Sequence, residues 1–409
     1  MYVKRKIEDD ILRYLERPEV LAVVGPRQCG KTTTLKQIFK KLEKAIFLSF
    51  DDQDVLALFE HNIKQFAATY LTGHKYVFID EFQYAKQGGK LLKYLHDNYK
   101  TKIIISGSSA VDLTVRAVKF LVGRIFILAM QPFDFYEFLT FKDKIYAEVY
   151  QKNQFNFSQY NLKSNLVAEQ EKVLRNYWQE YVIWGGYPAV VLADSQKDKE
   201  MILKNIYNTY FLREVKTVLH LADDYKLAKL LKALAVQIGQ MMEYNELNQI
   251  IEASAATTKR YLNFLAKTYV ADFLRPFYKN KRKEIVKNQK VYFYDTGFRN
   301  IAINDFRFFD ERPDAGQLLE NGVWMELIKR QYQVQYWRDK NKNEIDFIIG
   351  PGQGRSFAIE VKNNLSKCSK FPKAFVNDYP ETVCLCAYLN SKDKDKKSDV
   401  INAIFAALF

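Results

Sequence analysis

The sequence has few cysteines and few histidines, and neither residue type forms a metal-binding pattern. Its 409 residues include four of each. The spacing of Cys29, Cys368, Cys384 and Cys386 matches no zinc motif, and the histidines are scattered along the chain. Cys384 and Cys386 alternate within an apolar run that is typical of a strand, so we expect both to be buried thiols. We therefore predict neither a zinc site nor a histidine cluster.

Long apolar runs are also missing. No stretch stays apolar for the roughly 20 residues that a membrane-spanning helix needs. The best candidate, residues 120–139, is interrupted by an arginine, a glutamine, a proline and an aspartate. The first ten residues contain no apolar core of a signal peptide. We expect a cytoplasmic protein with no membrane partner.

Acidic residues are fewer than basic ones. Asp and Glu total 48 against 62 Lys and Arg, which gives a formal net charge of +14. This excess favours a polyanionic partner such as nucleic acid, although lysine-rich proteomes produce the same balance. The chain is 48% hydrophobic and 27% charged, so we expect a globular protein, and its length predicts two or three domains.

Residues 25–32 read Gly-Pro-Arg-Gln-Cys-Gly-Lys-Thr, between an apolar run at 20–24 and a segment at 33–39 that can continue as a helix. Glycines at this spacing let backbone N–H groups surround a phosphate, and a helix N-terminus adds a positive dipole end. We predict that Lys31 reaches the β- and γ-phosphates of ATP and that the Thr32 hydroxyl holds Mg²⁺. The predicted nucleotide-binding residues are Gly25, Pro26, Arg27, Gln28, Cys29, Gly30, Lys31, Thr32 and Thr33.

A later strand, residues 75–81, ends in Asp80 and Glu81. We predict that Asp80 binds Mg²⁺ through water and that Glu81 orients and deprotonates the attacking water. The next strand, 101–105, leads into Ser106, which could contact the γ-phosphate or could lie in a plain Ser/Gly turn.

Arg124 precedes another apolar run. It could serve as an arginine finger to the γ-phosphate of a neighbouring subunit, which would require a homo-oligomer, or it could make an internal ion pair. The alternation of strands and helices up to this point predicts a parallel sheet covered by helices.

The middle of the chain is predicted to be helical, with a winged helix at its end. A long helix is expected over 201–221, and it offers no chemistry. The order helix, turn, helix and strand over 227–278, followed by basic residues 279–283, indicates a winged helix with a basic wing tip. Such a module could place Thr258, Lys259 and Arg260 on DNA, or it could pack against protein.

Three strands are expected near the C-terminus, at 333–338, 344–349 and 356–362. Because side chains alternate along a strand, two adjacent strands would bring Asp346, Glu360 and Lys362 together. The carboxylates would bind a divalent metal, Glu320 from the preceding helix would add to the site, and Lys362 would act on the attacking water. The alternative is a sheet whose polar face carries salt-bridged charges. Asp295 is expected to cap a helix, and residues 400–409 to form one.

Together these motifs resemble the prokaryotic AAA+-type P-loop ATPases often called "archaeal ATPase" or "ATP-binding protein". Those proteins carry a P-loop domain, a winged-helix segment and a C-terminal domain of unknown function related to the PD-(D/E)XK nuclease fold. The resemblance covers nearly the whole chain. It supports Lys31, Thr32, Asp80 and Glu81 as the ATPase residues and places Arg124 at the family's Gly-Arg. Cys29 departs from the family, which more often has a small apolar residue there, and the thiol implies sensitivity to oxidation.

The predicted fold class is therefore α/β, with an AAA+-like P-loop sheet, a helical and winged-helix region, and an α/β restriction-endonuclease-like domain. The expected domains are residues 1–140, 141–225, 226–285 and 286–409. The predicted function is Mg²⁺-dependent ATP binding and hydrolysis, acting on or regulated by DNA, with metal-dependent DNase activity as an additional hypothesis. The alternative is a nucleotide-gated protein-interaction switch whose nuclease fold is degenerate.

Overall fold

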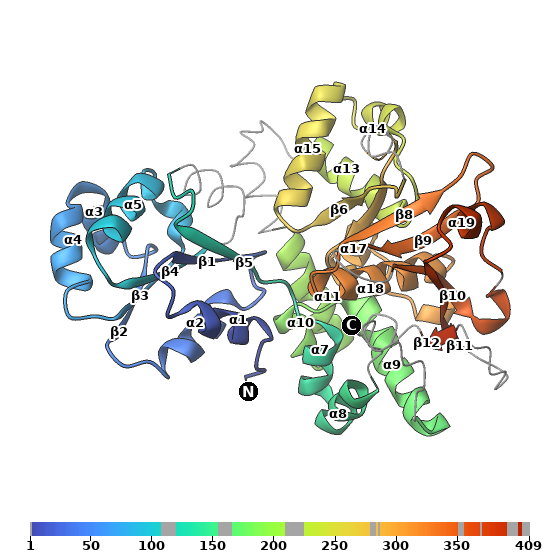
Figure 1. Ribbon diagram of the computed structural model, residues 1–409, viewed down its shortest axis with the longest axis horizontal. Helices are drawn as coiled ribbons and strands as arrows, with labels where there is room; N and C mark the ends of the chain where they lie inside the picture. Colours follow the sequence, from blue (N-terminus) through green and yellow to red (C-terminus); the bar gives the residue numbers. More distant parts are fainter. Residues whose placement is uncertain are drawn as a thin grey trace. The chain divides into compact units, whose positions relative to one another are not determined.

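The computed structural model describes residues 2–107, 120–153, 166–208, 225–278, 284, 287–350, 356–368, 370–390 and 400–402. The chain divides into two compact units (Figure 1). Unit 1 comprises Met1–Pro132 together with Lys267–Tyr269, and unit 2 comprises Phe133–Ala266 and Val270–Phe409. The finer division into four domains stays a prediction.

Unit 1 is built on a parallel five-stranded sheet in the order β2-β3-β4-β1-β5. Both faces of the sheet are buried, because Val20, Ala22 and Val24 of β1 enter one hydrophobic cluster while Leu21 and Val23 enter another. This confirms the predicted parallel sheet. The strands are β1 (Val20–Val24), β2 (Ala45–Ser49), β3 (Tyr76–Asp80), β4 (Lys102–Gly107) and β5 (Ile125–Ala129).

Helices cover both faces of this sheet (Figure 1). The helices α1 (Ile7–Tyr14) and α2 (Lys31–Phe39) supply apolar residues to one cluster, and α3 (Gln53–His61), α4 (Ile63–Tyr70) and α5 (Gly88–Asn98) supply the other. Since parallel strands end at the same edge, the segments that follow β1, β3 and β4 meet at the carboxyl edge of the sheet.

Unit 2 begins with helices and continues as a winged-helix arrangement. After α13 (Tyr225–Val236), α14 (Tyr244–Ile250) and α15 (Ala255–Lys267), the strands β6 (Ala271–Leu274) and β7 (Lys290–Phe293) pair antiparallel. Residues 279–283 of the predicted wing tip and most of the predicted helix 201–221 lie outside the described residues. The earlier helices are α7 (Phe135–Lys142), α8 (Lys144–Lys152), α9 (Ala168–Trp184), α10 (Pro188–Val191) and α11 (Gln196–Asn205).

The last part of unit 2 holds a mixed five-stranded sheet in the order β12-β11-β10-β9-β8. Strands β8, β9 and β10 pair antiparallel, whereas β10, β11 and β12 pair parallel. This sheet confirms the α/β class expected for the C-terminal part. The elements are α17 (Thr296–Ile303), α18 (Ala315–Lys329), β8 (Val334–Arg338), β9 (Glu344–Ile349), β10 (Phe357–Asn364), α19 (Lys373–Asp378), β11 (Val383–Asn390) and β12 (Val400–Asn402), with short 3₁₀ turns at Phe82–Tyr84, Phe309–Glu311 and Leu365–Lys367.

Two predictions for the C-terminal part are wrong. Residues 400–402 form β12 rather than the start of a helix, because pairing with β11 satisfies their backbone. Cys386 is not a free thiol, since the Leu365–Lys367 turn brings Cys368 beside β11 and the two cysteines form a disulfide. Cys384 is a free thiol, and it is only partly buried.

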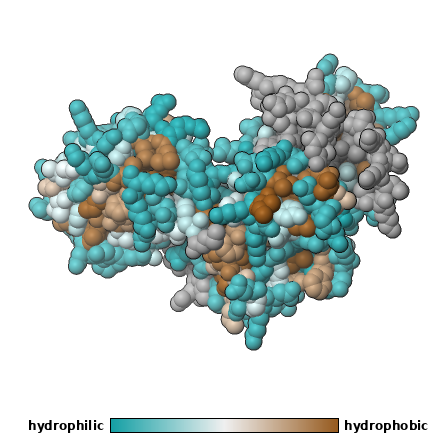
Figure 2. Space-filling view, turned by 90° about the horizontal axis from the view of Figure 1, so that it is seen from below, coloured by the Kyte–Doolittle hydropathy of each residue, from teal (hydrophilic) through white to brown (hydrophobic). Residues whose placement is uncertain are grey.

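Hydrophobic side chains gather in separate patches on the face seen in Figure 2, which is otherwise largely hydrophilic. None of the helices in the described part of the chain combines the length and the apolarity that a membrane crossing requires.

Candidate functional site

The loop after β1 needs both of its glycines. The backbone of Gly25 has φ +156°, and a Cβ at this position would lie 1.9 Å from the carbonyl oxygen of Met130. Gly30, which caps the N-terminus of α2, has φ 100° in the left-handed region that favours glycine. The glycine spacing of residues 25–30 therefore reflects the backbone that the loop adopts.

Lys31 is buried beneath this loop, with 6% of its surface exposed. Its Nζ donates to the carbonyl oxygens of Gly25 at 2.9 Å and Pro26 at 2.8 Å. Cys29 is fully buried, and its thiol donates to the carbonyl oxygen of Met130 at 3.4 Å. The loop thus folds around the lysine ammonium and buries the Cys29 thiol, for which the sequence predicts sensitivity to oxidation.

Asp80 lies at the carboxyl edge of the sheet and accepts hydrogen bonds from two hydroxyl groups. Its Oδ2 accepts from the Thr32 hydroxyl at 2.6 Å, and its Oδ1 accepts from the Ser106 hydroxyl and, at 3.1 Å, from the Glu81 N–H. The pairing of β3 with β4 places Ser106 beside Asp80. All of these donors are neutral, and within the described residues Asp80 forms no ion pair.

Glu81 follows in a left-handed backbone conformation, with φ 54°, which is uncommon for a residue other than glycine. Its carboxylate accepts from the Gln83 side chain. Burial raises the pKa of Glu81 and the neighbouring Asp80 charge raises it further, although the Gln83 hydrogen bond opposes this. A raised pKa makes the ionised carboxylate a better proton acceptor.

The structure does not bring Arg124 to this edge. The Val20 N–H donates to the carbonyl oxygen of Arg124 at 2.8 Å, which places Arg124 at the amino end of β1. The length of a five-residue strand, roughly 15 Å, separates it from the loop. Its Nε donates to Asp97 Oδ1 at 2.8 Å, so within one chain Arg124 makes the internal ion pair. An arginine finger to a neighbouring subunit stays a prediction.

The sequence patterns missed a group of N-terminal residues that hold the loop. Arg5 is 4% exposed, and it donates to the carbonyl oxygens of Cys29 at 2.7 Å and Gln131 at 2.6 Å. Glu8 accepts from the Arg5 backbone N–H at 2.8 Å and from the Tyr2 hydroxyl at 2.6 Å. Because Arg5 lies in a basic N-terminal stretch that reads as surface, only its tertiary contacts identify it.

The part of the chain that contains the P-loop resembles a known family. Residues 17–139 match a family model whose description is AAA domain. Unit 1 contains an AAA domain. Its parallel sheet and its P-loop agree with the AAA-type ATPase that the motifs predict. Residues 175–307 and 315–409 match two families that are described only as domains of unknown function.

Two relatives align with most of this chain, and the alignments are longer than the AAA domain. An uncharacterized protein of Haemophilus influenzae is 25% identical over 365 residues, covering 83% of this chain and 81% of that protein. An uncharacterized protein of Methanocaldococcus jannaschii is 27% identical over 379 residues, covering 89% and 79%. Among solved structures, the Aeropyrum pernix ORC2 protein in its ADP form aligns with 67% of this chain and 87% of its own, with 13% identity and a TM-score of 0.34. That score is too low to show a common fold for the aligned part.

The second cluster of charged residues is in unit 2, where Glu320, Glu344, Asp346 and Glu360 form what we call the carboxylate cluster. Lys362 Nζ lies 3.1 Å from Glu360 Oε2 and 3.9 Å from Asp346 Oδ2. The antiparallel pairing of β9 with β10 brings these residues together as the strand periodicity predicts. Burial raises the pKa of Glu320 to about 7, and the charge of Asp346 adds to the shift.

Lys290 of β7 enters the carboxylate cluster, and no sequence pattern indicated it. Its Nζ lies 2.5 Å from Glu344 Oε1, 3.2 Å from Glu320 Oε1 and 3.8 Å from Asp346 Oδ1. Within the described ranges, no group of three or more acidic, histidine or cysteine side chains is arranged to hold a metal ion. The predicted metal ligands are therefore close together, but they surround an ammonium group, and this arrangement does not fit a bound metal.

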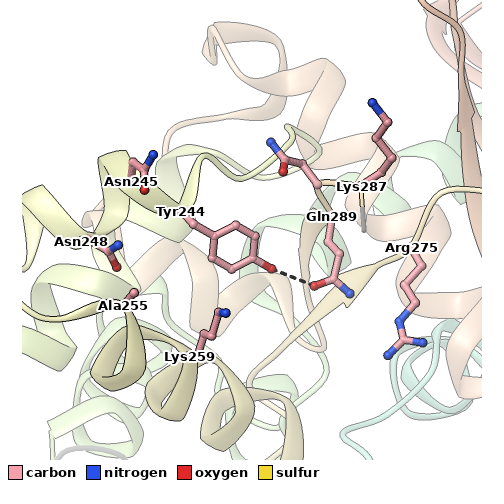
Figure 3. A pocket seen from close by; sticks show the side chains of 9 residues that line it. Tyr244, Asn245, Asn248, Ala255, Lys259, Arg275, Lys287 and Gln289 are labelled. Atoms are coloured by element: carbon pink, nitrogen blue, oxygen red, sulfur yellow. Dashed lines mark hydrogen bonds between the residues drawn. The ribbon is translucent and has the colours of Figure 1, made fainter. Parts of the chain in front are cut away.

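A basic groove lies on the winged-helix part of unit 2 (Figure 3). It has a volume of about 450 Å³, and a neighbouring hollow of about 370 Å³ shares four of its residues. Tyr244 and Gln289 point toward one another in it, joined by a hydrogen bond of 3.0 Å. The groove is lined by Tyr244, Asn245, Asn248, Ala255, Lys259, Arg275, Lys287, Asn288 and Gln289.

The charges of this basic groove are of one sign. Lys259, Arg275 and Lys287 line it without a carboxylate, and none of the three forms an ion pair in the described part of the chain. Thr258 does not contribute, because it is fully buried and its hydroxyl donates to the carbonyl oxygen of Ser254. Of the three residues predicted to face DNA on α15, Thr258 is therefore excluded and Lys259 lines the groove.

Proposed function

We propose that the AAA domain binds and hydrolyses ATP in a Mg²⁺-dependent reaction. The observation that carries this proposal is Asp80 between the hydroxyls of Thr32 and Ser106, directly beside the P-loop. Hydroxyl and carboxylate oxygens are the donors that Mg²⁺ prefers, and in the described part of the chain the Asp80 carboxylate accepts only from neutral donors. The donor set therefore fits the Mg²⁺ that accompanies ATP.

Each residue of the site has a role in this proposal. The backbone N–H groups of the P-loop bind phosphate oxygens, and Lys31 exchanges its carbonyl partners for the β- and γ-phosphates. Thr32 and Asp80 would hold Mg²⁺, which would neutralise charge on the phosphates. Glu81 accepts the proton of the attacking water, and Ser106 donates to the γ-phosphate.

ATP turnover by the full chain tests this. Lys31→Ala should lower turnover at least about 100-fold, because the ammonium stabilises charge on the transferred phosphoryl group. Lys40→Ala removes an exposed lysine just after α2 and should leave turnover unchanged. Equal turnover by wild type and Lys31→Ala would reject the proposal.

The partner that we propose for unit 2 is DNA, with contacts through the basic groove. Three cations that form no ion pair among the described residues lie beside amide side chains and suit the phosphate backbone, and the +14 net charge favours the same partner. The chain returns to unit 1 at Lys267–Tyr269, a segment that begins at the last residue of α15. We propose that this covalent path lets the nucleotide state influence DNA binding.

Two measurements test the DNA partner. ATP turnover is measured with and without linear, single-stranded and branched DNA, and we expect stimulation by at least one of them. Gel shifts at rising salt should show the loss of affinity that marks phosphate contacts. No binding at low salt would reject DNA and favour the alternative, a nucleotide-gated protein-interaction switch.

A homo-oligomer joined by Arg124 is a further part of the proposal. If Arg124 completes the site of a neighbouring subunit, specific ATP turnover should rise with protein concentration, and Arg124→Ala should remove that dependence. A concentration-independent rate that Arg124→Ala leaves unchanged would restrict Arg124 to its ion pair with Asp97. We do not propose DNA cleavage, because the Lys290 ammonium lies among the carboxylates that would have to hold the metal ion.

A further inference from the structure

We propose that Lys290 is a built-in cation that takes the position of a divalent metal ion in the carboxylate cluster. The nuclease-like part of unit 2 would then be a metal-free scaffold. This explains why the predicted nuclease residues come together in a protein whose proposed chemistry lies in the AAA domain.

The position of the ammonium group is the first argument. Lys290 Nζ lies within 3.8 Å of Glu320 Oε1, Glu344 Oε1 and Asp346 Oδ1, so it is the point on which the three carboxylates converge. A Mg²⁺ ion would need the same oxygens at about 2.0–2.1 Å. The ammonium and the metal ion therefore exclude one another.

The second argument is that Lys290 cannot easily leave. It is 1% exposed, it pairs with Leu274 across the β6–β7 ladder, and it also forms a bridge with Met241. The ring of Tyr336 lies 5.7 Å from Nζ. Moving the ammonium elsewhere within this buried setting would leave Lys290 unpaired and would remove from Glu320 its cationic partner, which is strongly unfavourable.

The third argument is the charge balance. Each of the four carboxylates already has a cation: Lys290 serves Glu320, Glu344 and Asp346, and Lys362 serves Glu360 and Asp346. Arg338 adds a second partner for Glu344 at 3.2 Å. Two further donors complete the set, because the Tyr292 hydroxyl bonds Glu320 and the Val361 N–H bonds Asp346 at 2.8 Å. A divalent ion would meet three fixed positive charges.

The proposal predicts that removing the ammonium creates a metal site. Mn²⁺ alone, without nucleotide, is the probe, and its binding to the full chain is measured by the loss of the free-ion EPR signal. All proteins carry Asp80→Asn, which removes the carboxylate that we propose to hold Mg²⁺ in the AAA domain. In the protein that keeps Lys290, we expect no Mn²⁺ binding that depends on Asp346. Lys290→Met should bind one Mn²⁺ at least about tenfold more tightly, and adding Asp346→Asn should abolish this.

Two results would overturn the proposal. One is Mn²⁺ binding with Lys290 present that disappears in Asp346→Asn, which would show a working metal site. The other is a folded Lys290→Met protein, checked by circular dichroism, that gains no Mn²⁺. If Lys290→Met does not fold, two proteins that keep Lys290 still decide, one with Asp346 and one with Asp346→Asn. Equal Mn²⁺ binding by both supports the proposal, and weaker Mn²⁺ binding by Asp346→Asn rejects it.

Discussion

Asp80 in the AAA domain and Asp346 in the carboxylate cluster are both buried aspartates of a β-sheet, but their partners differ in charge. Asp80 accepts from the hydroxyls of Thr32 and Ser106 and from a backbone N–H. Asp346 lies near Lys290 at 3.8 Å and Lys362 at 3.9 Å and also accepts one backbone N–H. Both arrangements offset the cost of burying an anion, but within the described residues only Asp80 has hydrogen-bond donors that are all neutral.

The basic groove is the converse of the Asp80 site. Its cations have no carboxylate partner in the described residues, so its charge is available to an anion from outside. Charge that a protein leaves unbalanced thus indicates the charge of its ligand. This difference is the basis on which we propose Mg²⁺ and ATP for the P-loop site, nucleic-acid phosphate for the basic groove, and no metal ion for the carboxylate cluster.

The largest effect is expected for Glu81, the proposed general base of the AAA domain. Glu81→Gln keeps the shape of the side chain but cannot accept a proton, so kcat for ATP should fall about 100- to 10,000-fold while ATP binding persists. Hydrolysis and binding of a fluorescent ATP analogue are measured separately. Glu43→Gln, an exposed glutamate of the same unit, is the control. Wild-type turnover by Glu81→Gln would remove the acid from the mechanism.

The next largest effect tests the neutral partners of Asp80, which distinguish it from Asp346 with its charged partners. Thr32→Val removes the hydroxyl that lies 2.6 Å from Asp80. The Mg²⁺ concentration for half-maximal turnover should rise about 10- to 100-fold, and EDTA should abolish turnover in either protein. Thr69→Val on α4 is the matched control. An unchanged Mg²⁺ requirement would contradict the assigned role of Thr32.

A smaller effect is expected where the P-loop is held in place. Arg5→Met removes the hydrogen bonds to the carbonyl oxygens of Cys29 and Gln131. The free energy of unfolding of unit 1 should therefore fall by about 1–3 kcal/mol. KM for ATP should rise more than kcat falls. Thermal unfolding and steady-state kinetics measure the two effects, with the exposed Arg13→Met as control. A variant with wild-type stability and KM would show that the N-terminal contacts are dispensable.

The smallest effect tests the basic groove. Lys259→Ala should lower the slope of log Kobs against log salt for DNA by about 1, with only a modest loss of affinity at low salt. Lys172→Ala removes an exposed lysine on α9 and should not change the slope. If both variants keep the wild-type slope, phosphate is not bound in the groove.

Local patterns predicted which side chains come together beside the P-loop, because elements that the chain forms locally position them. A glycine loop between a strand and a helix determines where Lys31 and Thr32 lie, and an apolar strand determines where Asp80 lies. The order of strands then brings Ser106 beside Asp80. The roles of these residues remain predictions, although their proximity is observed.

Prediction failed where a residue acts through partners that are distant in sequence. Arg5 binds carbonyl groups 24 and 126 positions away, and Lys290 meets Glu320 30 positions away. The disulfide of Cys386 likewise depends on how the 3₁₀ turn at Leu365–Lys367 lies beside β11. Nothing in the local sequence around these residues distinguishes them from surface charges or buried thiols.

The sequence by itself determined the P-loop, the two acids at the end of β3, the α/β class and the approach of Asp346, Glu360 and Lys362, because these depend on local motifs and on strand periodicity. Only the tertiary structure decided that Arg124 lies at the opposite edge of the sheet from the P-loop and that Lys290 lies among the carboxylates. The physical reason is that electrostatic partners are chosen by distance in space. Whether a carboxylate meets a hydroxyl or an ammonium group is settled only when the elements pack.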